Sequence, residues 1–355
     1  MSDLYGFIFN VSDLDIAALL CKGYNIIRKG RIFYMLSFSS IASGVALFVA
    51  LMIPGFALGK MKRIEAGAIK TLGNMLSDIA MPALVFVKLI QTDITKLDPW
   101  ALAICILLPA VIIFALHFIT KLLLPERDGG NEHLSARFCA MFSNCGFLGI
   151  PLAATLFPNA PEVTVYVSLA NVTNTFLLLT LGVGILSDRR GSSPKGILMA
   201  LMRPVTFAMI LGAICSIVGL GTLAPSIVSY SDTLAQLTTP LSMTVLGFEL
   251  SRLSLKSLFC DARVYIASAI RLLLSPLLAF SILVLLRYAF GVNVPYTLFS
   301  AMLIVTAVST AASASAMSLA HGIKGNLAAC ATLMSTLLCV ITLPLLWMLL
   351  GAAFV

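Results

Sequence analysis

From about residue 33 to its last residue, the chain is a succession of apolar segments, each long enough to cross a lipid bilayer. A spanning helix needs roughly 20 apolar residues. In lipid every backbone N–H and C=O must bond within the protein, which leaves only helices and closed barrels. The sequence is 60% hydrophobic and 11% charged, against about 25% charged in a soluble domain. This excludes a water-facing protein and predicts an all-α polytopic membrane protein.

Charged and turn-forming stretches such as GKMKR, LLPERDGGNEH, FPNAPE and SDRRGSSPKG divide the apolar sequence. We expect a first five-helix repeat at residues 34–190 and a second, inverted one at 191–355, after an N-terminal extension at 1–33. The ten transmembrane helices are predicted at 34–59, 64–90, 99–124, 134–157, 161–187, 196–220, 225–251, 261–290, 294–320 and 324–353.

Helix breaks recur in the two halves. Pro82, in DIAMPALVF, and Pro240, in QLTTPLSMTVLG, lie 158 residues apart and are expected to be structural hinges. A second break surrounds Pro151 in SNCGFLGIPLAATLF, and the same spacing puts its counterpart at Ser309. Interrupted helices at matching places are typical of transporters built from inverted repeats. Broken helices are tolerated in lipid only where they are buried in protein or line a cavity. We therefore expect interrupted helices four and nine to cross at the midplane.

Basic residues predict the orientation. The positive-inside rule places the odd-numbered loops in the cytoplasm and both termini outside. Since each repeat has five helices, the second must be inverted. The net charge of +8 is thereby assigned to topology and anionic lipid rather than to nucleic acid. The basic residues of these loops are Lys60, Lys62, Arg63, Lys70, Lys121, Arg127, Arg137, Arg189, Arg190, Lys195, Arg203, Arg252, Lys256, Arg263 and Lys324.

The N-terminal extension conflicts with this orientation, because Lys22, Arg28, Lys29 and Arg31 lie on the side predicted to be outside. Three interpretations remain open. The segment is an interfacial amphipathic helix, or it is a disordered leader, or Met35 is the real start, which would remove the conflict.

The stretch SNCGFLGIPL is the first candidate binding segment. Gly146, Gly149 and Pro151 disfavour a continuous helix, and Asn144 suits a cap. A half-helix beginning near Pro151 would point free N–H groups and its positive dipole end into the membrane, where they would favour an anion. The alternative is a packing kink. Cys145 lies in this break, whereas the eight scattered cysteines as a set have no metal-site spacing and are predicted to be small apolar residues.

The second candidate segment is residues 306–317, which lacks proline. Its Ser309, Thr310 and Ser313 either contribute to the site or allow close helix packing. Asn171 and Asn174 are three residues apart and therefore share one helix face. They either line the cavity or cross-link helices.

Two ionisable residues lie deep within predicted helices. Asp78, one turn before Pro82, is the candidate for proton or cation coupling, because an intramembrane ionisable residue is a functional hypothesis. Arg271, in AIRLLLSPLL, is expected to pair with a carboxylate, contact an anionic substrate, or bond helix carbonyls. No enzyme, nucleotide-binding or cofactor motif occurs in the sequence, so active transport would draw on an ion or substrate gradient.

Several segments, taken in order, resemble the auxin efflux carrier family, which includes plant auxin exporters and bacterial malonate-type permeases. The similar segments are GFALGKMKRIEAGAIKTLGNMLSDIAMPALVF for its first loop and second helix, SNCGFLGIPL for its fourth, MRPVTFAMILGAICSIVGL with TTPLSMTVLGFEL for its sixth and seventh, RLLLSP for its eighth and MSTLLCVITLP for its tenth. The resemblance implies two inverted five-helix repeats, a scaffold part, a mobile transport part, a site where helices four and nine cross, and organic anions as substrates.

The resemblance also assigns residues. It places the family's fourth-helix Asn and Pro at Asn144 and Pro151, and its fifth-helix polar position at Asn171 or Asn174. The ninth helix departs from the pattern, because the family usually has proline near Ser309 and often Asn near Ser313. The short loop SDRRGSSPKG is more similar to the bacterial permease branch than to the large plant carriers.

We therefore expect a secondary active transporter in the cell membrane that carries a small organic anion, a mono- or dicarboxylate, by alternating access. Proton or sodium coupling and a homodimer are left open, and no cofactor is expected. One alternative is a sodium-coupled bile-acid-type symporter, which strict sodium dependence of binding would favour. The other is a non-transporting receptor or channel, which binding without accumulation would favour.

Overall fold

The computed structural model describes residues 38–63, 65–126, 130–187, 202, 204–251, 261–324, 326–351 and 353–354. The expectations for residues 1–33 and for a start at Met35 lie outside this part of the chain. The described residues are mostly helical and contain no strand beyond one isolated β-bridge.

Helices that suit a bilayer dominate the described chain. Five are long and apolar enough to cross a membrane, namely Thr71–Gln91, Pro99–Leu123, Pro161–Leu186, Ala262–Ala289 and Asn326–Gly351. Shorter apolar helices occur at Leu47–Lys60, Cys145–Leu156, Pro204–Val218 and Tyr296–Ala307. Large apolar side chains such as Leu107, Phe118 and Leu122 are exposed along one long helix, as lipid contact requires. The prediction of a multi-pass α-helical membrane protein is confirmed.

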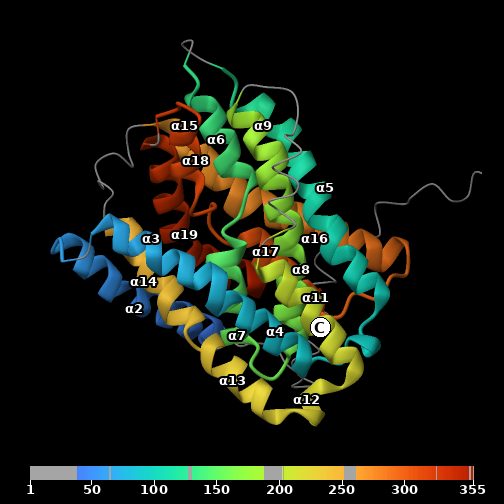
Figure 1. Cartoon of the computed structure of the whole chain (residues 1–355). Coiled ribbons are helices and arrows are strands. Elements are labelled where there is room, and N and C mark those ends of the chain that lie inside the picture. Colours follow the sequence, from blue (N-terminus) through green and yellow to red (C-terminus); the bar gives the residue numbers. More distant parts are fainter. Residues whose placement is uncertain are drawn as a thin grey trace, which may run out of the picture.

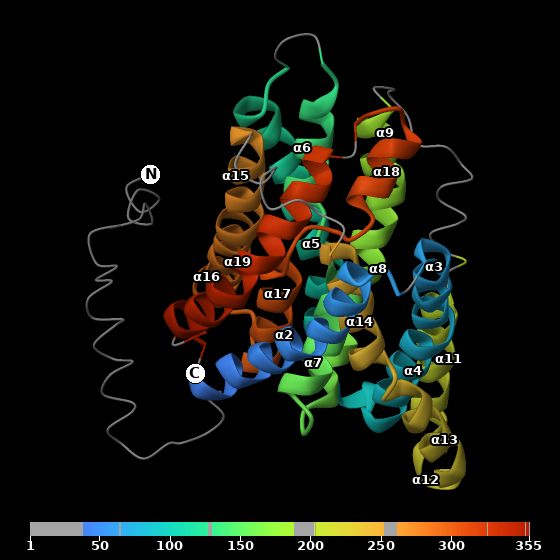
Figure 2. The same cartoon turned by 90° about the vertical axis from the view of Figure 1, so that its left-hand side faces the viewer.

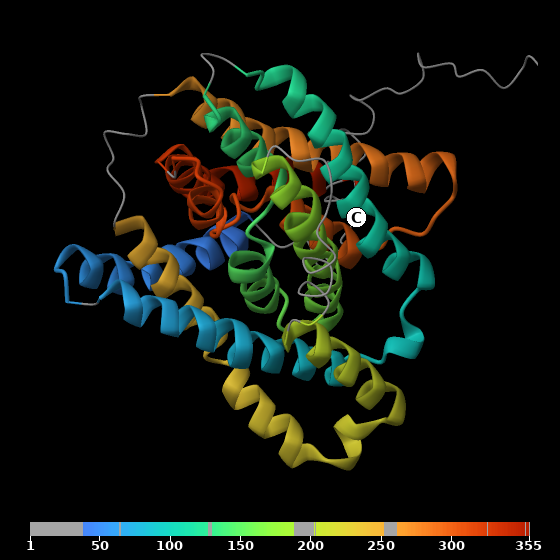
Figure 3. The same cartoon turned by 45° about the horizontal axis from the view of Figure 1, so that its top comes forward.

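One group of helices forms a layer along one side of the molecule, in the blue-to-cyan and yellow parts of Figures 1 and 3. We call this layer the panel. It consists of α2 (Phe38–Lys60), α3 (Ala66–Met75), the π-turn η2 (Leu76–Ala80), α4 (Met81–Gln91), α11 (Pro204–Val218), α12 (Leu220–Leu223), α13 (Pro225–Ala235) and α14 (Thr238–Ser251).

Glycines let the panel helices approach each other closely. A Cβ atom on Gly55 of α2 would overlap the carbonyl group of Thr244 in α14, and one on Gly247 of α14 would overlap the carbonyl group of Met52. Small residues at such contacts are the usual means of close helix packing in membranes, where no hydrophobic force draws helices together.

The remaining helices form a second body, which we call the bundle. It lies on the left in Figure 2, with much of the panel on the right. The short 3₁₀ helix η3 (Ile94–Lys96) lies between α4 and the bundle along the chain. The bundle consists of α5 (Pro99–Leu123), α6 (Glu132–Met141), η4 (Cys145–Gly149), α7 (Ile150–Leu156), α8 (Pro161–Leu177), η5 (Leu178–Gly182), α9 (Val183–Leu186), α15 (Ala262–Ala269), η7 (Ile270–Leu274), α16 (Ser275–Ala289), α17 (Tyr296–Ala307), α18 (Ala314–Ala320) and α19 (Asn326–Gly351).

Three prolines follow π-turns in the same register. The turns η2, η4 and η7 end two residues before Pro82, Pro151 and Pro276. In each case the residue just before the proline donates its N–H to the carbonyl five residues back. Proline has no N–H and its ring clashes with the carbonyl four residues earlier, so the wider turn keeps the helix hydrogen-bonded.

The fourth proline of interest follows a different kind of break. The helix predicted at 225–251 is interrupted at Gln236 and Leu237, between α13 and α14. Pro240 lies in the first turn of α14 and is exposed. A proline is tolerated in a first helical turn, because N–H groups there have no partner within the helix.

Candidate functional site

Two helices of the bundle end at the same place, and their chain extensions pair. The helix α6 ends at Met141 and α17 ends at Ala307. Beyond them Ser143 and Thr310 form an antiparallel bridge. The Asn144 N–H donates to the Ser309 carbonyl at 2.8 Å, and the Ala311 N–H donates to the Phe142 carbonyl at 3.0 Å. We call residues 142–144 and 308–310 the crossover.

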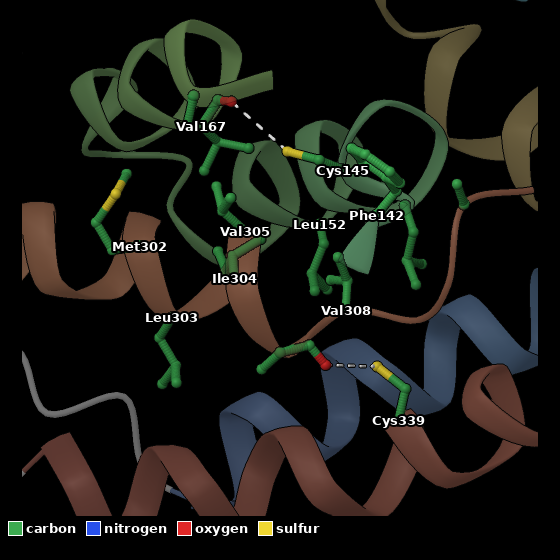
Figure 4. Close-up of a cluster of buried hydrophobic side chains, with 14 of the residues drawn as sticks. Phe142, Cys145, Leu152, Val167, Met302, Leu303, Ile304, Val305, Val308 and Cys339 are labelled. Atoms are coloured by element: carbon green, nitrogen blue, oxygen red, sulfur yellow. Dashed lines mark hydrogen bonds between the residues drawn. The ribbon is translucent and has the colours of Figure 1, made fainter. Parts of the chain in front are cut away.

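Side chains bond other backbone groups of the crossover. Asn174 accepts from the Ser143 N–H at 3.5 Å and donates its Nδ2 to the Ser143 carbonyl at 3.2 Å. Cys339 donates to the Ala307 carbonyl at 3.5 Å. Figure 4 shows Phe142 and Val308 among the apolar side chains packed around these bonds. Buried backbone groups need partners, and these bonds make the two breaks stable inside protein.

A buried arginine bonds both helix ends that lead into the crossover. Arg271 of η7 is 2% exposed. It donates to the Met141 carbonyl at the end of α6 at 3.0 Å, and to the carbonyls of Val305, at 3.3 Å, and Thr306 near the end of α17. Of the three roles expected for Arg271, the structure shows the bonds to helix carbonyls.

A cavity of about 180 Å³ lies where the crossover faces the panel. The bundle contributes residues of the crossover, η4, α8 and the turn before α18, and the panel contributes residues of η2, α4 and α11. Asp78 is the charged side chain among the described residues that line the cavity. The lining residues are Ser77, Asp78, Met81, Ser143, Asn144, Gly146, Phe147, Asn171, Val172, Asn174, Thr175, Leu178, Pro204, Val205, Thr206, Ala311, Ala312 and Ser313.

Asn144 is the cavity residue best placed to donate to a ligand. It is 3% exposed, and its Nδ2 has no partner among the described residues. An unpaired buried donor is costly, and Asn144 lies in the cavity wall. Asn144 also precedes the helix formed by η4 and α7, and its carbonyl accepts from the N–H groups of Leu148 and Gly149. The first N–H groups of such a helix lack partners within it, and Gly146 lies in the cavity wall.

The structure brings together part of the predicted set. Asn144, Gly146, Asn171, Asn174, Ser313 and Asp78 line one cavity. Of the two asparagines on α8, Asn174 is bonded to Ser143. Asn171 lies beside Gly146, where a Cβ atom built on the glycine would be 3.6 Å from its Oδ1.

The other predicted residues do not line the cavity. Cys145 is buried and donates to the Val167 carbonyl at 3.7 Å (Figure 4). Gly149 lies against Ile304, and Pro151 is buried in the first turn of α7. Ser309 is buried in the crossover, and Thr310 donates its hydroxyl to the Cys139 carbonyl at 2.9 Å.

The predicted position of the first break needs correction. The half-helix begins at Cys145 and not near Pro151, because a π-turn carries the helix through the glycines to the proline. The counterpart of Ser143 is Thr310, which is 167 residues away, whereas the proline spacing of 158 paired Pro151 with Ser309. The two intervals differ because the connections between the breaks differ in length.

Several cavity residues were missed. Ser143 and Thr175 are sequence neighbours of predicted asparagines, and this neighbourhood could have identified them. Ser77 and Thr206 come from the panel, and only the fold shows that η2 and α11 face the crossover. Within the described residues, no three His, Cys, Asp or Glu side chains gather as a metal site would require.

Comparisons with known proteins agree with this architecture. Residues 40–196 match the model of a family described as membrane transport protein. The chain is also 26% identical over 302 residues to a protein of Methanothermobacter thermautotrophicus named an uncharacterized transporter. That alignment covers 84% of this chain and 94% of the relative. Both similarities point to movement of a solute through a membrane.

Proposed function

We propose that this chain, whose residues 40–196 match the model of a family described as membrane transport protein, is a secondary active transporter for a small organic anion. The family match and the named relative make it a membrane transporter rather than an enzyme, and the resemblance to auxin efflux carriers is confirmed. The substrate class, the coupling ion and the alternating-access mechanism are our proposal.

The observation that carries the anion proposal is the unpaired Nδ2 of Asn144 in the cavity wall. A carboxylate oxygen is a suitable acceptor for this donor. The start of the helix at Cys145 adds backbone N–H groups and a positive dipole end at the same place. Asn171 adds an amide beside Gly146 in the cavity wall. These groups favour one carboxylate held between η4 and α8.

Asp78 is the proposed coupling residue. It lies in η2 of the panel, across the cavity from the crossover, and is exposed. An acidic side chain that shares a cavity with a bound anion repels it unless a proton or cation binds as well. We propose that one proton or sodium ion is coupled to each anion.

The proposed mechanism uses the two bodies of the molecule. The cavity has one wall from the panel and one from the bundle, so movement of the bundle against the panel would open it to either side of the membrane in turn. The proposed topology has ten crossing segments in two inverted repeats, with the panel as the scaffold.

The test is thermal stabilisation of the purified protein in detergent by a panel of carboxylates, with and without sodium. A ligand at 100 times its Kd adds about 2.7 kcal/mol. We expect malonate-like dicarboxylates or small monocarboxylates to stabilise the protein. Stabilisation by indole carboxylates would indicate auxin-like substrates, and an absolute need for sodium would favour the bile-acid-type alternative.

A substitution shows whether such binding is at the proposed site. Asn144→Asp replaces the free donor by a negative acceptor of the same shape, so stabilisation by the carboxylate should be lost. Asn131→Asp is the matched control, because Asn131 is exposed at the start of α6 and bonds no helix N–H. The anion proposal fails if no carboxylate stabilises the protein, and its location fails if Asn144→Asp binds as well as the unaltered chain.

A further inference from the structure

The guanidinium of Arg271 has no carboxylate partner among the described residues. Within the described part of the chain, its hydrogen bonds go to backbone carbonyls of α6 and α17, and its Nε has no partner. The thiol of Cys339 is close by, because it donates to the Ala307 carbonyl, one residue after the Thr306 carbonyl that Arg271 bonds. A buried charge in the membrane interior is costly unless something compensates it, so the compensation here must come from dipoles.

The two helix ends that Arg271 bonds supply that compensation. A helix C-terminus carries roughly −0.5 of an elementary charge, so the ends of α6 and α17 together carry about −1, which the guanidinium cancels. Its planar fork suits this task, because several N–H groups point in fixed directions. A lysine at this position would carry the charge but would not present the same fork.

The cavity lies directly beyond these helix ends. Met141, whose carbonyl Arg271 holds, is two residues before Ser143 in the cavity wall. Uncancelled, the negative ends of α6 and α17 would oppose an anion bound at Asn144. With Arg271 in place, the positive start of the helix at Cys145 is the dipole end that a ligand meets.

We propose that Arg271 is a positioning residue that makes the crossover selective for anions by cancelling the negative ends of both broken helices. This rests on the proposed anion substrate. Arg271 does not line the cavity and so acts through the crossover rather than by touching the ligand. Its role goes beyond holding the two helix ends together, because the positive charge of the guanidinium is required.

The test uses a thiol reporter that needs no substrate. Gly146 lies in the cavity wall at the start of η4, and a Cβ atom there meets nothing closer than 3.6 Å. A cysteine at a helix N-terminus is a reactive thiolate. Its rate of alkylation by uncharged iodoacetamide at neutral pH therefore reports the local potential. The rate is measured in Gly146→Cys with Arg271 unchanged and with Arg271→Met or Arg271→Lys.

We expect Arg271→Met to slow the alkylation by about fivefold or more, because a lost buried charge acts strongly at short range in protein. Arg271→Lys should retain most of the rate. The control is Arg287→Met in α16, a basic residue that donates to the Ala353 carbonyl, which should leave the rate unchanged. An unchanged alkylation rate in folded Arg271→Met would overturn the proposal. A residue that only holds the helix ends in place would not change the local electrostatic potential.

A second variant covers the case in which Arg271→Met does not fold. Cys339→Asp keeps Arg271 and places a carboxylate next to it, so the guanidinium charge is cancelled in place and the reporter thiol should again react more slowly. Unaltered reactivity would contradict the proposal. In the chain without the reporter, Arg271→Met should weaken malonate stabilisation. If malonate never binds while the reporter responds, the anion substrate fails, and only the electrostatic effect of Arg271 on the cavity stands.

Discussion

At the scale of single residues, the cavity contains one side chain that donates hydrogen bonds and another that accepts them. The Nδ2 of Asn144 donates, and the carboxylate of Asp78 accepts or binds a cation. Asn144 belongs to the bundle and Asp78 to the panel, so the distance between them changes if the bodies move. The proposed binding of an anion and the proposed binding of a proton or cation would therefore be coupled through one small space.

Replacing Asp78 by asparagine separates binding from coupling. Asp78→Asn keeps the size of the side chain and removes its negative charge, so substrate should still stabilise the protein while uptake driven by an ion gradient is abolished. Asp232→Asn in α13 is the control, because Asp232 bonds Gln236 outside the cavity. Uptake into proteoliposomes under an imposed gradient measures the difference. Unchanged uptake in Asp78→Asn would remove Asp78 from the coupling mechanism.

An ion-paired aspartate at the start of α15 makes stability depend on pH. The Arg263 guanidinium beside Asp261 holds the pKa of that carboxyl below its ordinary value, and the same Arg263 reaches Glu132 of α6 at 2.7 Å. A lowered pKa contributes stability that is present above about pH 4 and is lost as pH falls through the folded-state value.

We therefore expect Asp261→Asn to lower the melting temperature at pH 7 by a small amount, because the pair is partly exposed. The difference from the unaltered chain should shrink as pH falls below about 4. Thermal scans of both proteins between pH 7 and pH 3 measure it. A difference that stays constant over this range would mean that the Asp261 charge does not stabilise the fold.

Residue types alone predicted six of the eighteen described residues that line the cavity. Asn144 was identified because it precedes two glycines and a proline, and that local pattern predicts a helix start. The pattern could not show that Asn174 holds the Ser143 backbone whereas Asn171 lies beside Gly146. Both share one helix face, and only the position of the crossover distinguishes them.

At the scale of helices, the π-turns set which side chains face the cavity. The turn η2 contains Asp78 and ends two residues before Pro82. A π-turn adds one residue to a helical turn, and one residue corresponds to about 100° of rotation in an α-helix. The proline therefore fixes the direction in which Asp78 points relative to α4.

Pro82→Ala should relax this turn. Alanine supplies an N–H and removes the clash with the carbonyl of Asp78, so η2 can become regular helix and Asp78 turns away from the cavity. We expect near-normal or raised thermal stability but strongly reduced uptake. Pro109→Ala in α5 is the matched control, because Pro109 lies inside a helix without a π-turn. Full uptake in Pro82→Ala would show that the turn does not position Asp78.

The sequence predicted that helices are interrupted, but it did not locate the two breaks equally well. Proline and glycine mark strain in a helix, and in η4 that strain is absorbed by a π-turn while the chain unwinds at residues 142–144, before the glycines. At 308–310 no proline marks the break. There the backbone finds its hydrogen-bond partners in a distant segment. The Asn144 N–H donates to the Ser309 carbonyl, and the Ala311 N–H donates to the Phe142 carbonyl. Local sequence does not reveal these partners.

At the scale of the molecule, the panel and the bundle meet along several helices, because α4 packs on α8 and α2 packs on α7 and α19. Leu76, Ala80 and Met81 of the panel form a buried cluster of their own, with Phe147 of the bundle packed against it. Inside the bundle, by contrast, polar bonds join the broken helices. Ser135 of α6 donates to Ser318 of α18 at 2.8 Å, and the Ser143–Thr310 bridge joins the crossover. We therefore expect transport to use movement of the bundle against the panel rather than movement within the bundle.

Cross-links distinguish these two kinds of movement. A short bifunctional thiol reagent that joins Met81→Cys to Phe147→Cys ties the panel to the bundle, and uptake should stop and return after reduction. A cross-link between Ser135→Cys and Ser318→Cys lies within the bundle and should leave most of the uptake. The chain without introduced cysteines controls for native thiols. If the first cross-link leaves uptake intact, the solute passes without relative movement of the two bodies, as in the channel alternative. If the second stops uptake, the bundle itself rearranges during transport.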